Sequence, residues 1–281
     1  MQRVLIIGTG LIGASVGLAL RAAGFAGTIT GWDRNPAQTS AALPLGAIDH
    51  AVDDPLEAAR AAEVVVLATP VLAILEWMLR LVPALREGQL VTDVGSTKQQ
   101  ICACAAAGHY NEPGRAAFLP GHPMAGKETA GAAAAEAGLF RGAMWLFTSP
   151  GAPAPLAADW RAWVAKFGAR SLDLEPERHD ELVAWASHLP QFLATALTAA
   201  LEDEFGASED LRAVGGRALR EMTRLGASPF SMWRDIAETN TKPIAQTLLA
   251  LEKRLASVRK ELAKPSLREE FDRANRFRSR F

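Results

Sequence analysis

Cysteine is scarce in this chain, and long apolar runs are missing. The two cysteines, Cys102 and Cys104, have a spacing that suits neither a usual pair of zinc ligands nor a disulfide framework. No apolar run approaches the ~20 residues that cross a bilayer, and the first predicted strand starts at Arg3, which leaves no room for a secretory signal. We therefore expect a cytoplasmic protein without a metal site or a membrane segment.

The chain also lacks an excess of charge, an internal repeat and any low-complexity tract. Its 30 Lys and Arg residues are balanced by 31 Asp and Glu residues, so the formal net charge is -1. Such a balance offers no broad attraction to nucleic acid or to an anionic membrane, and small-molecule chemistry is the better expectation. The length of 281 residues predicts two domains, at about 150 residues each.

A glycine-rich motif stands close to the start of the chain. An apolar segment, Arg3–Ile7, runs into Gly-x-Gly-x-x-Gly at Gly8, Gly10 and Gly13. Glycines at these positions permit a tight turn, let the backbone approach a pyrophosphate and allow the next helix to pack closely. Asp33 ends a second predicted strand, where its carboxylate can accept hydrogen bonds from ribose hydroxyls. This context favours a dinucleotide site over a merely structural turn.

The choice of dinucleotide depends on the residues around that second strand. The carboxylate of Asp33 favours the ribose diol of NAD and repels the 2′-phosphate of NADP. The neighbouring Arg34 is a complication, because an arginine can accommodate that phosphate in part. Leu11 and Ile12 complete the glycine motif at the start of the predicted helix, whose free amides attract phosphate. We expect NAD as the cofactor.

Short β-rich segments alternate with helical ones through the first half of the chain. The alternation predicts a Rossmann-type α/β domain with a parallel sheet and helices on both faces. The carboxyl ends of its strands should converge on the cofactor, which brings the turn at Thr69 and Pro70 to those at 93–98 and 121–126. The predicted strands are Arg3–Ile7, Thr28–Trp32, Val64–Ala68, Leu90–Asp93, Ala117–Leu119, Met144–Thr148 and, after a linker at 149–155 and a helix at 156–167, Arg170–Leu174.

From about Pro176 the strand signal is replaced by helical spacing. Apolar residues recur at that spacing over 182–201, and Pro190 should kink this helix. The domains are therefore expected at 1–174, an NAD-binding domain, and at 175–281, a mostly helical domain that completes the substrate site.

The helical domain carries one more long apolar stripe, over 244–262, and ends in a charged tail at 267–281. The stripe packs either inside its own domain or against a second copy of the chain. We favour a homodimer, because ~105 residues of helices form a thin core.

Several motifs in the sequence carry polar groups suited to catalysis. They are Asp93-x-Gly-Ser-x-Lys98, His122-Pro-x-Ala-Gly126, Ser187-His-Leu-Pro190 and Thr223-Arg-Leu followed by Met232-Trp-Arg-Asp235 and Asn240. With Gly-x-Gly-Leu-Ile-Gly, their order and spacing along nearly the whole chain resemble the prephenate/arogenate (cyclohexadienyl) dehydrogenase family. The resemblance implies NAD-dependent oxidative decarboxylation of a cyclohexadienol, a step of tyrosine biosynthesis in which the ring becomes aromatic.

The resemblance also implies roles for individual residues. His122 matches the catalytic histidine, and a neutral imidazole has the right pKa range to accept the proton of the reacting hydroxyl. Ser96 matches the serine that hydrogen-bonds this hydroxyl and the cofactor; the alternative is a helix N-cap. Arg224 matches the arginine that binds a substrate carboxylate, against the alternative of a surface ion pair. His188 and Trp233 match walls of the substrate pocket, although core packing would also account for the tryptophan.

Two positions depart from the family pattern. Gln191 stands where prephenate-using relatives often have a second histidine, and Lys127 replaces a smaller polar residue. One helical turn from His188, Gln191 should face the same pocket. An uncharged amide dictates neither substrate, so prephenate, arogenate or both are left open. Lys98 is expected to support its loop or to face solvent.

Two other functions are compatible with parts of the sequence. Another oxidoreductase that combines a Rossmann-type and a helical domain, such as an imine or 3-hydroxy acid dehydrogenase, would leave the motifs at His122 and Arg224 without a purpose. A dinucleotide-sensing module without catalysis would need neither of them.

Overall fold

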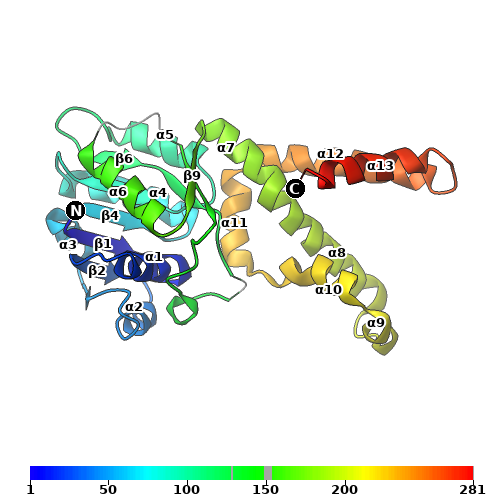
Figure 1. Ribbon diagram of the computed structural model, residues 1–281, viewed down its shortest axis with the longest axis horizontal. Coiled ribbons are helices and arrows are strands. Elements are labelled where there is room, and N and C mark those ends of the chain that lie inside the picture. Colours follow the sequence, from blue (N-terminus) through cyan, green and yellow to red (C-terminus); the bar gives the residue numbers. More distant parts are fainter. Residues whose placement is uncertain (128, 149–153, 281) are drawn as a thin grey trace.

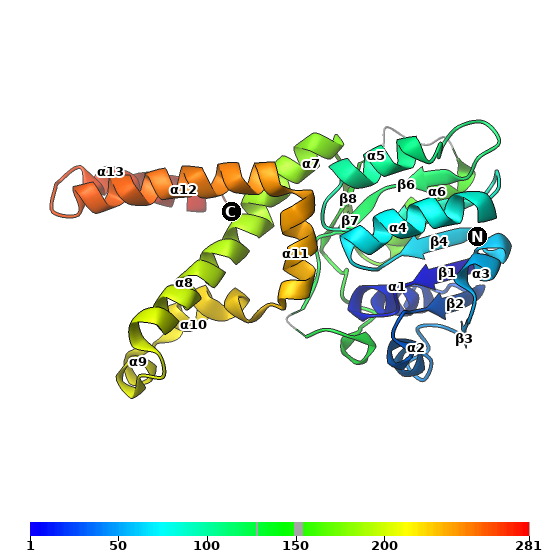
Figure 2. The same ribbon diagram turned by 180° about the vertical axis from the view of Figure 1, so that it is seen from behind.

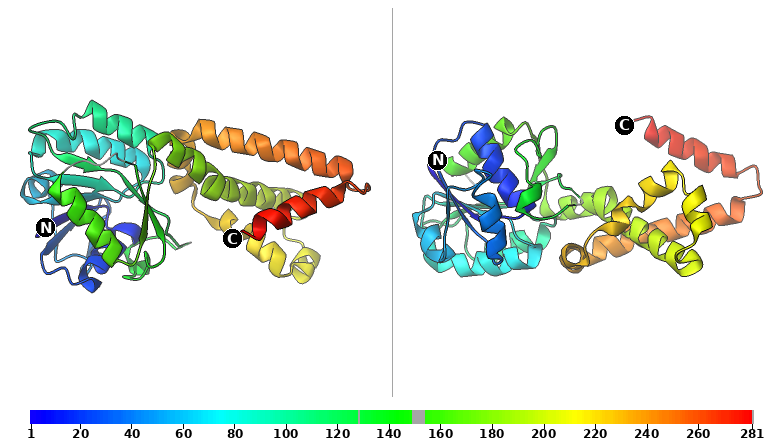
Figure 3. Two further views of the ribbon diagram at one scale, coloured as in Figure 1. Left: turned by 45° about the horizontal axis from the view of Figure 1, so that its top comes forward. Right: turned by 90° about the horizontal axis from the view of Figure 1, so that it is seen from below.

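The chain folds into two lobes that lie side by side (Figures 1 and 3). The structure is a computed structural model that describes residues 1–127, 129–148 and 154–280. The first lobe contains the sheets and ends with a strand at Asp173, and the second lobe consists of helices from Pro176 onward in the described residues. Most of the predicted linker at 149–155 lies outside the described residues, as does the last residue of the predicted tail.

The helices and strands have the following bounds. The strands are β1 (Arg3–Ile7), β2 (Thr28–Trp32), β3 (His50–Ala51), β4 (Val64–Leu67), β5 (Leu90–Asp93), β6 (Ala117–Leu119), β7 (Gly121–Pro123), β8 (Met144–Phe147) and β9 (Arg170–Asp173). The helices and helical turns of the first lobe are α1 (Leu11–Ala22), α2 (Pro36–Ala42), α3 (Pro55–Ala61), α4 (Val71–Leu81), η1 (Val82–Ala84), α5 (Gln99–Ala107), η2 (Ala132–Ala134) and α6 (Pro155–Lys166). Those of the second lobe are α7 (Pro176–Val183), η3 (Ala184–His188), α8 (Leu189–Phe205), α9 (Glu209–Val214), α10 (Arg217–Thr223), η4 (Arg224–Ala227), α11 (Phe230–Thr239), α12 (Thr241–Glu261) and α13 (Leu267–Arg278).

The main sheet is parallel, and its strands run in the order β3-β2-β1-β4-β5-β6. Alternate residues of β1 point to opposite faces: Val4 and Ile6 pack with α1 and α6, while Leu5 and Ile7 pack with α3, α4 and α5. Figure 2 shows α4 and α5 covering the second face. The predicted Rossmann-type sheet with helices on both faces is confirmed.

Two of the predicted strands belong to a separate sheet. β8 and β9 pair with each other and with the short β7 in the order β7-β8-β9, and β7 runs antiparallel to β8. Pro120 has no amide hydrogen and stands between β6 and β7, so the chain leaves the parallel sheet there. The prediction that these strands extend one parallel sheet is therefore wrong. The two-residue β3 was not predicted.

The long helix around Pro190 is interrupted one turn earlier than predicted. The π-helical turn η3 separates α7 from α8, and Pro190 is the second residue of α8, directly after this wider turn. The stripe on α12 is only partly covered: Ile244 is buried, whereas Leu255 is exposed. Helix α13, the charged tail, runs back beside α12, and Arg254 pairs with Glu270 at 2.8 Å.

Candidate active site

The glycine motif forms the turn between β1 and α1. Gly8 has φ +96°, and a Cβ there would lie 2.4 Å from the carbonyl oxygen of Ala68. A Cβ on Gly13 would lie 1.8 Å from the carbonyl oxygen of Gly8, so α1 packs closely on the turn. By contrast, a Cβ on Gly10 would meet nothing within 4 Å. Open space at Gly10, beside the amides of Leu11 and Ile12 at the uncapped start of α1, fits a bound pyrophosphate.

The second strand brings Asp33 to the same turn. One carboxylate oxygen of Asp33 accepts a hydrogen bond from the amide of Thr9 at 2.8 Å, and the other accepts from the amide of Asn35 at 2.9 Å. The carboxylate is therefore held beside the glycine turn at the carboxyl end of β2, while Arg34 is exposed. This arrangement suits the ribose of a dinucleotide.

Thr69 and Pro70 follow β4, the neighbour of β1 in the sheet. Thr69 is half-buried, and Pro70 is the N-cap of α4 without contributing a side-chain hydrogen bond. The turn lies close to the glycine motif, since a Cβ on Gly8 would approach Thr69 as well, at 2.9 Å. The residues predicted to bind the cofactor thus gather at the carboxyl edge of the sheet.

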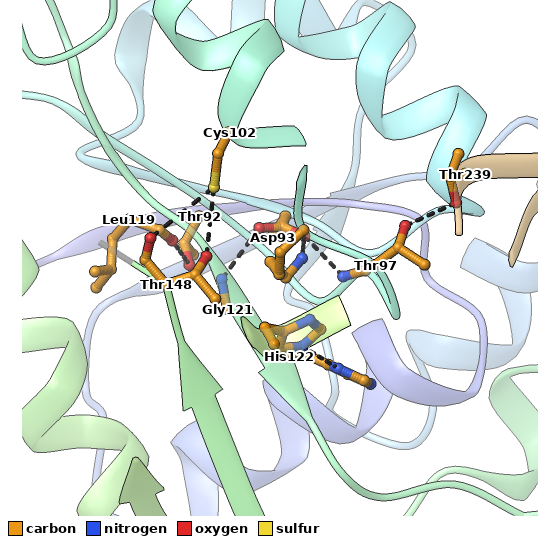
Figure 4. Close-up of polar contacts among 12 residues, drawn as sticks. Thr92, Asp93, Thr97, Cys102, Leu119, Gly121, His122, Thr148 and Thr239 are labelled. Carbon is orange, nitrogen blue, oxygen red and sulfur yellow. Dashed lines mark hydrogen bonds and ion pairs between the residues drawn. The ribbon is translucent and has the colours of Figure 1, made fainter. Parts of the chain in front are cut away.

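A buried ion pair organises the loop after β5. The Lys98 ammonium lies 2.5 Å from a carboxylate oxygen of Asp93, and both side chains are fully buried. The same carboxylate accepts hydrogen bonds from the amides of Gly95 and Gly121, so it joins the ends of β5 and β7 (Figure 4). Lys98 supports its loop, as predicted, and does not face solvent.

Ser96 lies inside this loop and is half-buried. Helix α5 begins at Gln99, and no side chain of the N-cap residue caps it. The backbone amides of the N-cap residue Lys98 and of Gln99, the first residue of α5, instead donate to the carboxylate of Asp180 in the second lobe, at 2.7 and 3.0 Å. The capping alternative for Ser96 is therefore wrong, and its contact with a substrate hydroxyl stays a prediction.

His122 lies in β7, directly after the backbone amide that Asp93 holds. We expected it on a turn, but the short pairing with β8 makes it a strand residue, and it is buried. Its Nδ1 is 2.9 Å from Nε2 of His179, and Nδ1 of His179 is 2.8 Å from a carboxylate oxygen of Asp180. Figure 4 shows His122 below Asp93 and Gly121.

His179 and Asp180 were not predicted from the sequence as site residues. Both are fully buried in α7, in a segment between two glutamates that reads as a solvated helix start. The available signal was the adjacent pair of titratable residues directly after the last strand. Their position in the second lobe means that this lobe contributes to the environment of His122.

Burial keeps the histidines of the site uncharged. Burial lowers the pKa of His122 well below its ordinary value, and the nearby His179, Lys98 and His188 lower it further. Burial also lowers the pKa of His179, although the hydrogen bond to Asp180 opposes the shift. The pKa of His188 falls to about 4 for the same main reason. A neutral imidazole at His122 can accept a proton at neutral pH.

Besides the contact of His122 with His179, further hydrogen bonds across the junction hold the lobes together. Besides Asp180 at α5, the carboxylate of Asp235 on α11 accepts from the amide of Leu72 in the first turn of α4, at 3.3 Å. The hydroxyls of Thr97 and Thr239 lie 2.8 Å apart. Carboxylates of the second lobe therefore stand at the N-termini of two helices of the first, which the helix dipoles favour.

His188 and Trp233 meet on the second lobe. Their rings pack edge to face with centroids 5.9 Å apart. The side-chain amide of Asn240 donates to Nδ1 of His188 at 3.1 Å. The same amide donates to the carbonyl oxygen of Asp180 at 2.9 Å, which ties His188 to the residue behind His179. Trp233 is only half-buried, so a pocket wall and a packing role are both compatible with its place.

Gln191 is buried and binds the chain's own η4 segment. Its amide nitrogen donates to the carbonyl oxygen of Leu225 at 2.7 Å and to the hydroxyl of Thr195 at 3.2 Å. Its amide oxygen accepts from the hydroxyl of Ser228 at 3.0 Å. Arg224 is the first residue of η4 and is exposed. Gln191 thus anchors the segment that carries Arg224, and a direct contact of Gln191 with substrate stays a prediction.

Lys127 is also engaged within the protein. Its ammonium donates to the carbonyl oxygen of Ala134 at 2.9 Å and pairs with Glu136 at the same distance. Among the described residues, no group of three His, Cys, Asp or Glu side chains is arranged to hold a metal ion. None of the described helices is long and apolar enough to cross a membrane.

Comparison with known proteins finds two family models that match the chain in succession. The model described as "Prephenate dehydrogenase, nucleotide-binding domain" matches residues 16–172, and "Prephenate dehydrogenase, dimerization domain" matches residues 175–274. The prephenate dehydrogenase of Bacillus subtilis is 33% identical over 244 residues, which are 86% of this chain and 65% of that protein. This chain therefore spans less than two thirds of the length of that relative.

Solved structures resemble the whole chain. Prephenate dehydrogenase from Aquifex aeolicus, in complex with hydroxyphenyl propionate and NAD+, has a TM-score of 0.89 and 30% identity, covering 100% of this chain and 98% of that one. Synechocystis arogenate dehydrogenase has a TM-score of 0.80 and 27% identity, covering 100% and 99%. An imine reductase from Myxococcus stipitatus, at 17% identity and a TM-score of 0.53, shares the fold alone.

Proposed function

Because the chain belongs to the prephenate dehydrogenase family, we propose that it oxidises prephenate, arogenate or both with NAD, releasing carbon dioxide and leaving an aromatic ring. One observation carries the proposal beyond the family: His122 is a buried imidazole whose pKa burial lowers well below the ordinary value, and it stands beside the carboxyl end of β5 in the nucleotide-binding sheet. An imidazole can accept a hydroxyl proton during hydride transfer only in its neutral form, and burial both favours that form and excludes water.

The residues of the chain divide the work of this reaction. The glycine turn and Asp33 would hold NAD, which would supply the acceptor for the hydride that leaves the hydroxyl-bearing ring carbon. His122 accepts the hydroxyl proton as that carbon takes on carbonyl character. When the ring carboxylate leaves as carbon dioxide, its bonding electron pair enters the ring and the oxygen becomes a phenolate. His122 then returns the proton to this oxygen, so no net proton is consumed.

Ser96 and Arg224 would handle the substrate itself. The Ser96 hydroxyl can both donate and accept, which suits a group that orients the reacting hydroxyl toward His122. The Arg224 guanidinium can bind a carboxylate through two parallel hydrogen bonds and keeps its charge at every working pH. His188 and Trp233 would form the wall of the substrate pocket between Ser96 and Arg224.

We further propose that the chain forms a homodimer and that the boundary between its two domains lies between residues 174 and 175. Support comes from the match of 175–274 to a dimerisation domain and from apolar side chains that α12 and α13 leave exposed, among them Leu255, Leu262 and Phe271. Light scattering during gel filtration tests the dimer. A monomer at micromolar concentration would contradict it.

A cytoplasmic location is part of the same proposal. Cys102 and Cys104 are unpaired thiols, as is usual in a reducing compartment. Fractionation of cells that express the full-length protein tests the location.

Turnover with both substrates tests the activity. The purified chain is mixed with NAD and either prephenate or arogenate, and reduced nicotinamide is followed by its absorbance. We expect turnover with at least one of the two substrates, and a loss of it in His122→Asn while NAD binding is kept. Absence of turnover with both would contradict the proposed function.

A further inference from the structure

We propose that His179 and Asp180 are positioning residues that fix His122 in the tautomer whose Nδ1 carries the hydrogen and whose Nε2 is a bare acceptor. The catalytic consequence rests on the proposed function, whereas the tautomer itself does not. Neither residue was part of any motif recognised in the sequence.

The direction of each hydrogen bond follows from the Asp180 end. The amides of Lys98 and Gln99 can only donate, and both donate to the carboxylate of Asp180. An ionised carboxylate only accepts, so Nδ1 of His179, 2.8 Å from it, carries a hydrogen and donates as well. In a neutral ring the other nitrogen, Nε2 of His179, then has a free lone pair.

This lone pair determines the state of His122. Its Nδ1 lies 2.9 Å from Nε2 of His179, so Nδ1 of His122 is the donor of that hydrogen bond. A neutral His122 has one ring hydrogen, and with it on Nδ1 the Nε2 atom is left as the acceptor. When Nε2 takes up a proton, the hydrogen bonds behind it keep their direction and connect the new positive charge to the carboxylate of Asp180.

The charged groups around the pair keep His179 in the neutral form that this arrangement needs. Its ring faces Asp93 from β5, Lys98 from the loop after β5, Asp180 from its own helix, and His122 from β7. His188 approaches His122 and Asp180 from the second lobe. A charged His179 would donate from both nitrogens, which would force Nδ1 of His122 to accept and place the hydrogen on Nε2. Protonation of His179 would therefore block the base, and burial lowers its pKa and so prevents this at neutral pH.

Asp180 is well suited to anchor this pair, because three elements hold it. It belongs to α7, its carboxylate caps α5 of the first lobe, and its carbonyl oxygen accepts from Asn240. A residue that merely filled space would not need a fully buried carboxylate with three donors. The tautomer of the base is thus coupled to the docking of the two lobes.

Two substitutions of His179 separate a positioning role from a packing role. His179→Phe keeps an aromatic ring at this position but offers no acceptor to His122, and kcat should fall by about 10²-fold, within the range for a disabled acid–base group. His179→Gln places an amide oxygen near the former Nε2 atom and should recover kcat to within about ten-fold of the wild type. His50→Gln, at an exposed histidine, is the matched control and should leave kcat unchanged. Equal losses in the Phe and Gln variants would overturn the proposal.

Nitrogen-15 NMR of the histidine rings tests the tautomer without substrate. The chain has only five histidines, so the spectrum can be assigned with single substitutions. We expect Nδ1–H and a bare Nε2 at His122 in the wild type and a loss of this preference in His179→Phe. Circular dichroism and NAD binding verify that the variant is folded. Nε2–H at His122 in the wild type would overturn the proposal even if turnover is observed, and absent turnover with the expected tautomer would count against the proposed function alone.

Discussion

Acidification should destabilise the fold, because His188 is buried in its uncharged form. Its pKa in the folded chain is about 4, against 6.5 as the ordinary value. The unfolded chain therefore binds a proton more readily than the folded one between these two values, and stability falls as pH decreases through that window. The side-chain amide of Asn240 also disfavours protonation of His188, because its nitrogen already donates to Nδ1 of His188. The amide could accept a hydrogen from Nδ1 only by losing its hydrogen bond to the carbonyl oxygen of Asp180.

The size of the effect follows from the shift. A difference of one pKa unit corresponds to about 1.4 kcal/mol, so His188 alone should cost about 2 kcal/mol in the free energy of unfolding between pH 7.5 and pH 5. At pH 4 and below the loss levels off at about 3 kcal/mol. Such a loss is a large part of the 5–15 kcal/mol by which domains are usually stable.

Urea unfolding followed by circular dichroism at pH 7.5, 6 and 5 measures this loss. His188→Gln removes the titrating ring. Between pH 7.5 and pH 5 the free energy of unfolding of this variant should therefore fall by about 2 kcal/mol less than that of the wild type. Carboxylates titrate in both proteins and cancel in the difference. His50→Gln, at an exposed site, should keep the wild-type slope. If the free energy of unfolding depended on pH equally in the wild type and in His188→Gln, the titration of His188 would not be the cause of the acid destabilisation.

The other predictions concern catalysis and binding. His122→Asn should keep NAD affinity but lower kcat by ~10²–10⁴-fold, and near-normal turnover of this variant would exclude His122 as the base. Because burial lowers the pKa of His122, the wild-type kcat/KM should be flat above pH 6.5 and fall only at more acidic pH. Arg224→Gln should raise the substrate KM by ~10–100-fold, as expected for a lost hydrogen bond to a charged group, with a smaller change in kcat; an unchanged KM would place Arg224 outside the pocket. The wild type should prefer NAD over NADP in kcat/KM, and Asp33→Ser should narrow this preference; comparable values for the wild type would contradict the role of the carboxylate. Gln191→Leu should raise KM for prephenate and arogenate alike, because η4 loses its anchor, whereas a change for one substrate only would show that Gln191 reads the substrate side chain directly.

Features that depend on neighbours in the sequence were predictable. The turn from Gly8 to Gly13 follows from the conformational freedom of glycine, and the parallel sheet follows from apolar segments that alternate with helices. Asp33 was found because its distance from the glycine motif is typical of dinucleotide sites. The resemblance to a family identified His122 as a candidate base, which its type and spacing alone would not have done.

Features that depend on contacts over long distances in the chain were not predictable. His179 is 57 residues from His122, and only the packing of α7 against the first lobe brings the two rings together. Lysines are rarely buried, so burial of Lys98 could not be expected without knowing that Asp93 neutralises it. The separate sheet of β7, β8 and β9 was missed because strand propensity does not specify a strand's partner.

The fate of one hydrogen atom shows whether the chain oxidises its substrate with NAD. In a single turnover, the substrate is deuterated at its hydroxyl-bearing ring carbon, and reduced nicotinamide and carbon dioxide are both quantified. We expect that the deuterium appears on the nicotinamide, that one carbon dioxide is released for each nicotinamide reduced, and that His122→Asn slows both together. Carbon dioxide release without nicotinamide reduction, or deuterium that is lost to solvent, would contradict it.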